Sequence, residues 1–250
     1  MIAVGTSHGF ILAFDVMQTL RWCCKEHAAQ GAVSSLAFNE ENSRLLAGFA
    51  RGCIIMIDTA SGDTIRTLSN IITPFSGVLN LKWTGKAALA LCSDTGGSVW
   101  TLSFTRRLGM RGCDSRCFFS GARGEVCAVE PLVIVEDEHP MKAYCIVALA
   151  TLSKFFVVMI RPRLKVVKFH ALTGPSDSLP LLSWQMVLIQ SADSSRVVDP
   201  VLAAARGNCV YFHQVRFNQW FYSARNFMQD FYLSAVDAFR ENFFAVSEAY

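Results

Sequence analysis

A unit made of an apolar run, a short turn and a second apolar run recurs along the chain. Three segments superpose well, namely Ile2–Asp15, Leu45–Asp58 and Leu89–Leu102, and two fit less well, Ile146–Ile160 and Val201–Val215. The turn positions of these five units are Gly9, Gly52, Gly97, Lys154 and Asn208, so successive turns lie 43, 45, 57 and 54 residues apart. A period of about 40–45 residues is typical of a propeller blade. We attribute the two longer intervals to insertions around residues 136–140 and 191–196.

Each period divides into four short strands. In the second unit the predicted strands are Ala32–Phe38, Leu45–Phe49, Cys53–Ile57 and Thr64–Leu68, separated by Asn-, Gly- and Ser-containing turns. The inner strands are nearly all apolar, which indicates burial on both faces, whereas the last strand alternates apolar and polar positions. Stacked four-stranded blades require this decrease in apolar content from the inner strands to the outer strand.

The pattern therefore predicts an all-β fold, a partial (open) WD-type β-propeller of four-stranded antiparallel blades, with about four full blades and two incomplete ones. We expect one domain over residues 1–250, with blades at 32–70, 78–118, 126–171 and 180–225 and incomplete blades at 1–25 and 232–250. The ends fall inside blades, so we expect an arc cut from a longer propeller. A β-sandwich is the alternative fold, but its turns would not recur at the same position of a repeated unit. The spacing of the polar residues within 224–244 fits an amphipathic helix as well as it fits strands.

Composition narrows the class of protein. Apolar residues make up 52% of the chain and charged residues 17%, which excludes a disordered segment. The apolar runs are far shorter than the ~20 residues of a membrane helix, and the first residues lack the pattern of a secretory signal. The net charge of +3 is too small to indicate a nucleic-acid partner. Nine unevenly spaced cysteines indicate reduced thiols in the cytoplasm.

No motif predicts catalysis, a cofactor or a metal. Cys113, Cys117 and Cys127 form the main cysteine cluster, but they lack the paired spacing of a zinc site. The sequence has no G-x-S-x-G nucleophile motif, and the acidic run Glu136–Glu138 reads as a solvated loop. Gly121–Gly124 and Thr95–Gly97 are too short for phosphate loops, and we expect hairpin turns there. We therefore expect a protein that is not an enzyme.

A basic patch is the one candidate binding surface. It comprises Arg106, Arg107, Arg111, Arg116 and Arg123 in one outer-strand and loop region. These arginines suit an acidic partner surface or anionic lipid headgroups. Charge on an outer strand also protects a sheet edge from unwanted strand addition, and we favour this second reading.

Several segments resemble the vacuolar protein sorting-associated protein 8 family. The resemblance is carried by Leu45–Gly52, Ser115–Val126, Leu179–Gln185 and Pro200–Gly207, with support from Gly5–Gly9 and Gly31–Phe38. It covers roughly residues 1–215, and Ser115–Val126 is its most specific part. The chain departs from the family pattern of WD repeats, since Phe14-Asp15, Ile57-Asp58 and Leu102-Ser103 stand where Trp-Asp dipeptides are expected.

The resemblance implies a WD-type propeller of a large tethering subunit of the CORVET complex, which bridges early endosomal membranes. It implies contacts with an early-endosomal Rab GTPase and with sister subunits, in endosomal fusion and transport to the lysosome or vacuole. The expected location is cytoplasmic and peripheral to endosomal membranes, with membrane contact through partners and none with nucleic acid. A generic WD-repeat scaffold, such as a substrate adaptor of a ubiquitin ligase, is the alternative, and a propeller glycosidase is a third possibility.

Overall fold

The computed structural model describes the chain as two compact units, residues 1–125 and 126–250. Within them it describes residues 1–85, 88–107, 110–123, 126–132, 145–151, 154–161, 165–171, 185–189, 201–206 and 209–214. The strands of the first unit are β1 (Ile2–Gly5), β2 (Ile11–Phe14), β3 (Leu20–Cys24), β4 (Val33–Phe38), β5 (Arg44–Phe49), β6 (Ile54–Asp58), β7 (Thr64–Leu68), β8 (Val78–Trp83), β9 (Leu89–Asp94), β10 (Val99–Arg107) and β11 (Met110–Phe119). Two 3-10 turns, η1 (Ala28–Gln30) and η2 (Gly121–Arg123), complete it.

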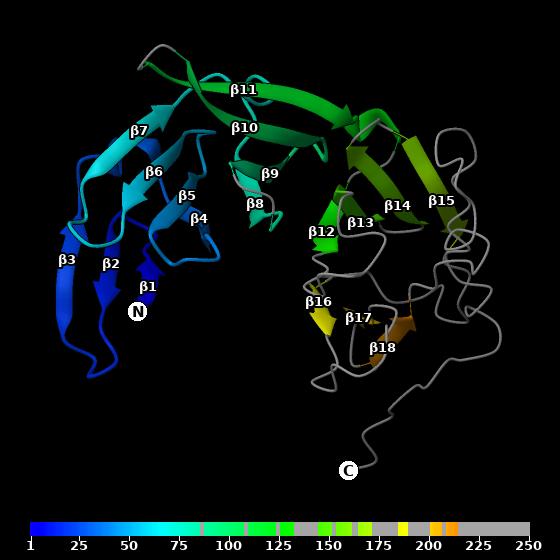
Figure 1. Ribbon diagram of the computed structural model, residues 1–250, viewed down its shortest axis with the longest axis horizontal. Helices are drawn as coiled ribbons and strands as arrows, with labels where there is room; N and C mark the ends of the chain where they lie inside the picture. Colours follow the sequence, from blue (N-terminus) through cyan, green and yellow to red (C-terminus); the bar gives the residue numbers. More distant parts are fainter. Residues whose placement is uncertain are drawn as a thin grey trace. The chain divides into compact units, whose positions relative to one another are not determined.

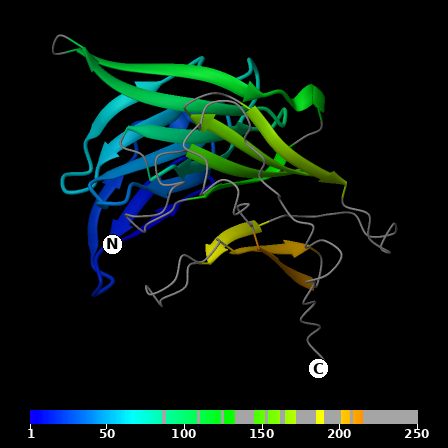
Figure 2. The same cartoon turned by 45° about the vertical axis from the view of Figure 1, so that its right-hand side comes forward.

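The second unit contributes β12 (Val126–Leu132), β13 (Cys145–Thr151), β14 (Lys154–Arg161), β15 (Lys165–Ala171), β16 (Gln185–Ile189), β17 (Val201–Arg206) and β18 (Cys209–Gln214). The described strands form three four-stranded sheets, β4–β7, β8–β11 and β12–β15, and two three-stranded sheets, β1–β3 and β16–β18. Each is an antiparallel meander in chain order (Figures 1 and 2). The predicted fold class, a partial propeller of four-stranded blades, is confirmed.

The first strands of successive sheets lie against one another, β4 against β8 in the first unit and β12 against β16 in the second. The strand of each sheet that comes last in the chain lies at the other edge of the sheet. This is the radial order of a propeller blade, with an inner and an outer strand. The end of the predicted blade at 180–225 and the whole predicted incomplete blade at 232–250 lie outside the described part of the chain.

The second sheet shows why its inner strands are almost wholly apolar. On β5, Leu45, Ala47 and Phe49 join a core cluster shared with the first sheet, while Leu46 joins a cluster shared with the third. The alternation of a strand sends successive side chains to opposite faces. Both faces of β5 and β6 are therefore buried between neighbouring sheets, as the unbroken hydrophobic runs predicted.

The recurring glycine turn is confirmed in the first three sheets. Gly9, Gly52 and Gly97 adopt φ of 79°, 84° and 75° in the turns that follow β1, β5 and β9. An added Cβ at Gly52 would lie 2.4 Å from the Ser76 carbonyl oxygen, so both the conformation and the space require glycine. Lys154 is not a turn residue, because it begins β14, and Asn208 lies outside the described residues.

The structure differs from two further expectations of the sequence analysis. Residues Gly121–Arg123 form η2, which connects β11 to β12, and not a hairpin turn. The arginine-rich region expected as an outer strand and loop contains the ten-residue β11, which pairs with β10 from Met110 to Phe119. The β10–β11 hairpin extends beyond β9, whose pairing with β10 ends at Ser103 (Figure 2).

Candidate interaction surface

The turns at one end of the first unit's sheets are tied together around a buried carboxylate, Asp94. Its Oδ2 accepts hydrogen bonds from the Thr73 hydroxyl at 2.6 Å and the Trp100 indole N–H at 2.9 Å. Its Oδ1 accepts one from the Ser98 backbone N–H at 3.0 Å. Asp94 is fully buried, so these donors replace the water that the carboxylate loses. The aspartate thereby fixes the β7–β8 loop to the β9–β10 turn.

Hydrogen bonds continue this contact on both sides. The Gly77 N–H donates to the Thr95 hydroxyl at 3.0 Å, and the Thr95 N–H donates to the Gly77 carbonyl at 2.9 Å. The Gly121 N–H donates to the Ser98 hydroxyl at 3.0 Å, which places η2 beside the same turn. This end of the sheets is therefore a continuous row of rigidly held turns, the kind of scaffolded loop surface that proteins use for binding.

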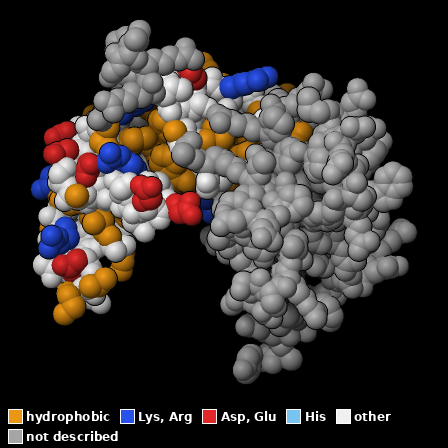
Figure 3. All heavy atoms as spheres, viewed as in Figure 1, with side chains coloured by type: hydrophobic (Ala, Val, Ile, Leu, Met, Phe, Trp, Pro, Cys, Tyr) orange, Lys and Arg blue, Asp and Glu red, His pale blue; other side chains and the backbone are white. Residues whose placement is uncertain are grey.

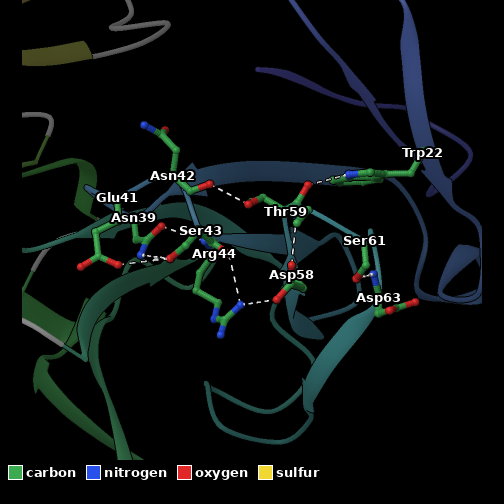
Figure 4. Close-up of polar contacts among 11 residues, drawn as sticks. Trp22, Asn39, Glu41, Asn42, Ser43, Arg44, Asp58, Thr59, Ser61 and Asp63 are labelled. Atoms are coloured by element: carbon green, nitrogen blue, oxygen red, sulfur yellow. Dashed lines mark hydrogen bonds and ion pairs between the residues drawn. The ribbon is translucent and has the colours of Figure 1, made fainter.

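A second polar network lies at the opposite end of the second sheet (Figure 4). Arg44 forms an ion pair with Asp58, and the Asn39 side chain accepts a hydrogen bond from the Arg44 N–H at 2.8 Å. The Thr59 hydroxyl donates to the Asn42 carbonyl at 2.6 Å. These bonds join the β4–β5 turn to the β6–β7 turn, so the two turns of this sheet move as one piece.

Asp58 of this network carries a perturbed acidity. The Ala60 backbone N–H, donating at 3.0 Å, and the Arg44 guanidinium hold the pKa of the Asp58 carboxyl below its ordinary value. Both groups favour the ionised form. The carboxylate is therefore charged throughout the neutral range, and its role is to organise the turn.

Indole side chains connect neighbouring sheets. The Trp22 N–H on β3 donates to the Thr59 carbonyl at 2.9 Å (Figure 4), and the Trp83 N–H on β8 donates to the Ala37 carbonyl at 3.1 Å. An added Cβ at Gly62 would lie 2.7 Å from the Trp22 ring, so the β6–β7 turn packs directly on the indole. Each tryptophan thus combines apolar burial with a bond to the next sheet.

The predicted arginine patch is divided by the strand register. Arg106 lies directly opposite Arg111 at the far end of the β10–β11 hairpin, with Arg107 beside them. Arg116 is exposed and pairs with Thr101, five residues further along β11, which is about 17 Å at the usual strand rise. Arg123 ends η2, at the Asp94 end of the sheets. The structure brings Arg106, Arg107 and Arg111 together and separates the other two from them.

The cysteines of the predicted cluster are protonated at neutral pH. Burial raises the pKa of Cys113 and of Cys127 to about 11, and burial followed by the Asp94 charge raises the pKa of the more exposed Cys117. Thiols in this state are poor nucleophiles and poor metal ligands. Within the described residues no group of three or more His, Cys, Asp or Glu side chains could hold a metal ion. In the same part of the chain, no helix has the length and apolar content to cross a membrane.

Exposed apolar side chains were not predicted from the sequence. On the first sheet they include Ile2, Val4, Val16, Met17 and Leu20, and Figure 3 shows apolar side chains at the tip of the β2–β3 hairpin, at its lower left. Phe75 on the β7–β8 loop is fully exposed. A period-two pattern would have shown that Ile2 and Val4 share one face of β1, but only the coordinates show that the first unit leaves this face uncovered.

The comparisons with known proteins agree with this fold. A family model described as the Vps8 beta-propeller matches residues 1–231. A vacuolar protein sorting-associated protein 8 homolog from Drosophila melanogaster is 63% identical over 215 residues, which is 86% of this chain and 18% of the relative. The Mus musculus homolog is 42% identical over 222 residues, covering 86% of this chain and 15% of the relative. The chain thus spans less than a fifth of these relatives.

Solved structures with a similar fold are distant in sequence. The Cps50 (Swd1) β-propeller domain from Myceliophteria thermophila superposes with a TM-score of 0.62 at 12% identity, covering 90% of this chain and 64% of that one. A chain of the mitotic checkpoint complex gives a TM-score of 0.59 at 16% identity, covering 86% of this chain and 59% of that one. At these identities the likeness supports the propeller fold alone.

Proposed function

Because this chain belongs to the Vps8 β-propeller family, we propose that it is a protein-interaction platform of an endosomal vesicle-tethering complex of the CORVET type. It acts in endosomal fusion and in transport to the lysosome or vacuole. The observation that carries the proposal is 63% identity to a vacuolar protein sorting-associated protein 8 homolog over 86% of the chain. The platform works without catalysis, by presenting rigid turns and sheet edges to protein partners.

The proposed partners are an early-endosomal Rab GTPase and other subunits of the tethering complex. Membrane contact is then indirect and the chain is cytoplasmic. Two features support this mode of action. The turns at the Asp94 end are fixed by buried hydrogen bonds, and the raised pKa values of Cys113, Cys117 and Cys127 disfavour the nucleophilic thiolate at neutral pH. A surface held rigid before binding loses less conformational entropy on association.

The test is a binding assay with purified components. The 250-residue chain is immobilised and offered endosomal Rab GTPases loaded with a GTP analogue or with GDP, and separately the recombinant subunits of the complex. We expect retention of at least one subunit and stronger retention of one Rab in its GTP form. Failure to retain any of these proteins would overturn the platform proposal, and equal retention in both nucleotide states would overturn direct recognition of an active Rab.

We also propose the basic end of the β10–β11 hairpin, Arg106, Arg107 and Arg111, as a partner contact, with Arg116 and Arg123 as separate positions. Arg106 pairs with Arg111 in the strand register, so this end of the hairpin concentrates positive residues that would complement an acidic surface. Replacing these three residues with Glu should weaken retention at least tenfold and reduce its salt dependence. The control variant reverses three exposed charges elsewhere in the first unit, Arg21→Glu, Lys25→Glu and Arg51→Glu, and so changes the net charge by the same amount. Equal weakening by both variants would show that only net charge matters.

A further inference from the structure

The β7–β8 loop presents a single aromatic side chain on a tight turn. The Ser76 N–H donates to the Thr73 carbonyl at 3.1 Å, which closes a four-residue turn over Thr73–Ser76. Pro74 fixes the second position of the turn, and Phe75 at the third has a φ of 62°. This is the pattern of a type II turn, in which the third position favours glycine or asparagine.

Phenylalanine is an unfavourable residue at this position. Its Cβ makes the left-handed conformation costly, and the whole side chain lies in water instead of a core. The other described non-glycine residues with positive φ are small or polar, namely Gln18, Asn42, Asn70 and Ala88. Phe75 therefore combines backbone strain with complete exposure of an aromatic ring. Strain of this kind persists only where the surrounding structure enforces it.

The surroundings do enforce it. The Thr73 hydroxyl is bound to buried Asp94 at 2.6 Å, and Gly77 exchanges two hydrogen bonds with Thr95. The Ser76 carbonyl lies where a Cβ on Gly52 would be, so the turn also rests against the β5–β6 turn. The aromatic ring is thus carried by a loop fixed at its base on two sides. Because the loop is already fixed, little further conformational entropy is lost when a partner binds the ring.

We propose that Phe75 is an anchor residue that inserts into an apolar pocket of a folded protein partner. This inference rests on the platform function proposed above and names the residue that carries it. The two turns that contact the Phe75 turn, Ala50–Gly52 and Thr95–Gly97, consist of small residues except for the exposed Arg51. Small neighbours allow a partner to approach closely, and an aromatic anchor within such a surface is typical of a binding hot spot.

The same surroundings favour a protein pocket over a lipid surface. Interfacial membrane binding requires a broad apolar face with several basic residues. Here a single exposed ring stands beside Thr73, Ser76 and the small residues of the neighbouring turns, and not within a broad apolar face of the described residues. The proposed partner site is therefore a protein pocket that is apolar inside.

The experiment compares Phe75→Asn with Val16→Asn in the 250-residue chain. Val16 is also exposed and apolar, but it lies on the β2–β3 turn at the opposite end of the first unit's sheets. Asparagine tolerates positive φ, so Phe75→Asn should raise the Tm by about 2–4 °C. The same variant should lose about tenfold or more in affinity for the subunit or Rab that the unaltered chain retains. Val16→Asn should change that affinity by less than about twofold.

A photo-crosslinker, p-benzoylphenylalanine, placed at position 75 or 16 provides a second measurement. We expect a crosslink to the retained protein from position 75 alone. Equal affinity of Phe75→Asn and the unaltered chain, or crosslinks from both positions, overturns the anchor while the platform proposal stands. Binding of vesicles of equimolar phosphatidylcholine and phosphatidylserine that requires Phe75 would assign the ring to lipid and overturn it as well. If the unaltered chain retains none of the purified proteins, both proposals fail.

Discussion

Asp94 illustrates how much of this fold depends on single buried polar residues. Its two oxygens accept hydrogen bonds from Thr73, Ser98 and Trp100, which belong to two separate turns and a strand. Removing the carboxylate leaves these donors without an acceptor in a site closed to water. The cost of such a deletion is dominated by the groups left behind and not by the bonds that were lost.

Asp94→Ala should therefore destabilise the chain by about 2–5 kcal/mol. Trp100→Phe, which removes one donor and keeps the ring, should cost about 1–2 kcal/mol. Urea unfolding followed by circular dichroism measures both. Asp63→Asn, an exposed acid on the β6–β7 turn, serves as control and should stay within about 0.5 kcal/mol of the unaltered chain. A loss for Asp94→Ala no larger than the control would refute the role of the carboxylate.

Asp58 predicts a pH dependence of stability. Its pKa is lower in the folded chain than in the unfolded chain, because the Ala60 N–H and then Arg44 favour the carboxylate. The stabilisation is therefore complete above the unfolded value of about pH 4 and is lost as the pH falls through the folded value. Urea midpoints between pH 6 and pH 3 should fall less steeply for Asp58→Asn than for the unaltered chain. Parallel curves would contradict this expectation.

Thiol reactivity follows from the same residue-level environment. Cys92 is fully buried, and burial raises its pKa far above neutrality, whereas Cys117 is exposed. Native-state alkylation with iodoacetamide, read by peptide mass spectrometry, should modify Cys117 at least about tenfold faster than Cys92. In denaturant the two rates should converge. Equal native rates would show that the third sheet is not closed around Cys92.

At the scale of elements, the strands were predictable where hydrophobic pattern decides and not where pairing decides. The runs predicted at Leu45–Phe49, Cys53–Ile57 and Thr64–Leu68 agree with β5, β6 and β7 to within one residue at each end. The length of β11 was missed because Gly112, Asp114 and several arginines read as a loop, whereas pairing with β10 holds them extended. For the same reason the sequence could not show that Arg116 lies apart from the hairpin end.

The candidate surface was harder to predict than the fold. An isolated Thr-Pro-Phe-Ser stretch indicates a turn, but no pattern in it indicates that Phe75 takes a positive φ or remains uncovered. Likewise the partner of Trp22 is 37 residues away on another sheet. Such features depend on contacts between elements, which a local pattern does not contain.

The contact of Gly62 with Trp22 gives a test of the junction between the first two sheets. Gly62→Ala introduces a Cβ at positive φ, 81°, and within 2.7 Å of the indole, so it should cost about 1–3 kcal/mol. The double variant Gly62→Ala, Trp22→Ala should cost less than the sum of the two single changes, because the clash is gone. Additive losses in urea unfolding would show that the indole does not pack on this turn.

At the largest scale, adjacent sheets of the first unit stabilise one another. Clusters of apolar side chains lie between the first and second sheets and between the second and third. The first sheet has such a neighbour on one face, whereas Ile2, Val4 and Leu20 remain exposed. β1 pairs with β2 alone among the described strands, so its other edge is open. Exposed apolar faces and open edges favour association.

The isolated chain should accordingly self-associate at high concentration, and Val4→Lys should reduce this association. A lysine on an edge strand opposes pairing with a second strand. Size-exclusion chromatography with light scattering over a range of concentrations measures the average mass. Leu79→Lys, the same kind of change at an exposed position of β8, which pairs with β9 and lies against β4, is not expected to reduce association. An unchanged mass profile for Val4→Lys would show that another surface is responsible.

The tryptophan side chains that donate hydrogen bonds to neighbouring sheets can serve as intrinsic fluorescence probes. Trp22 joins the first sheet to the second, and Trp83 joins the third sheet to the second. Separation of either pair of sheets would break the indole hydrogen bond and expose the ring to solvent. The fluorescence of variants that keep only one of these two tryptophans would then show whether one junction between sheets opens before the other. Such a sequence of opening would mean that one junction between sheets can separate while the neighbouring sheets of the first unit stay folded.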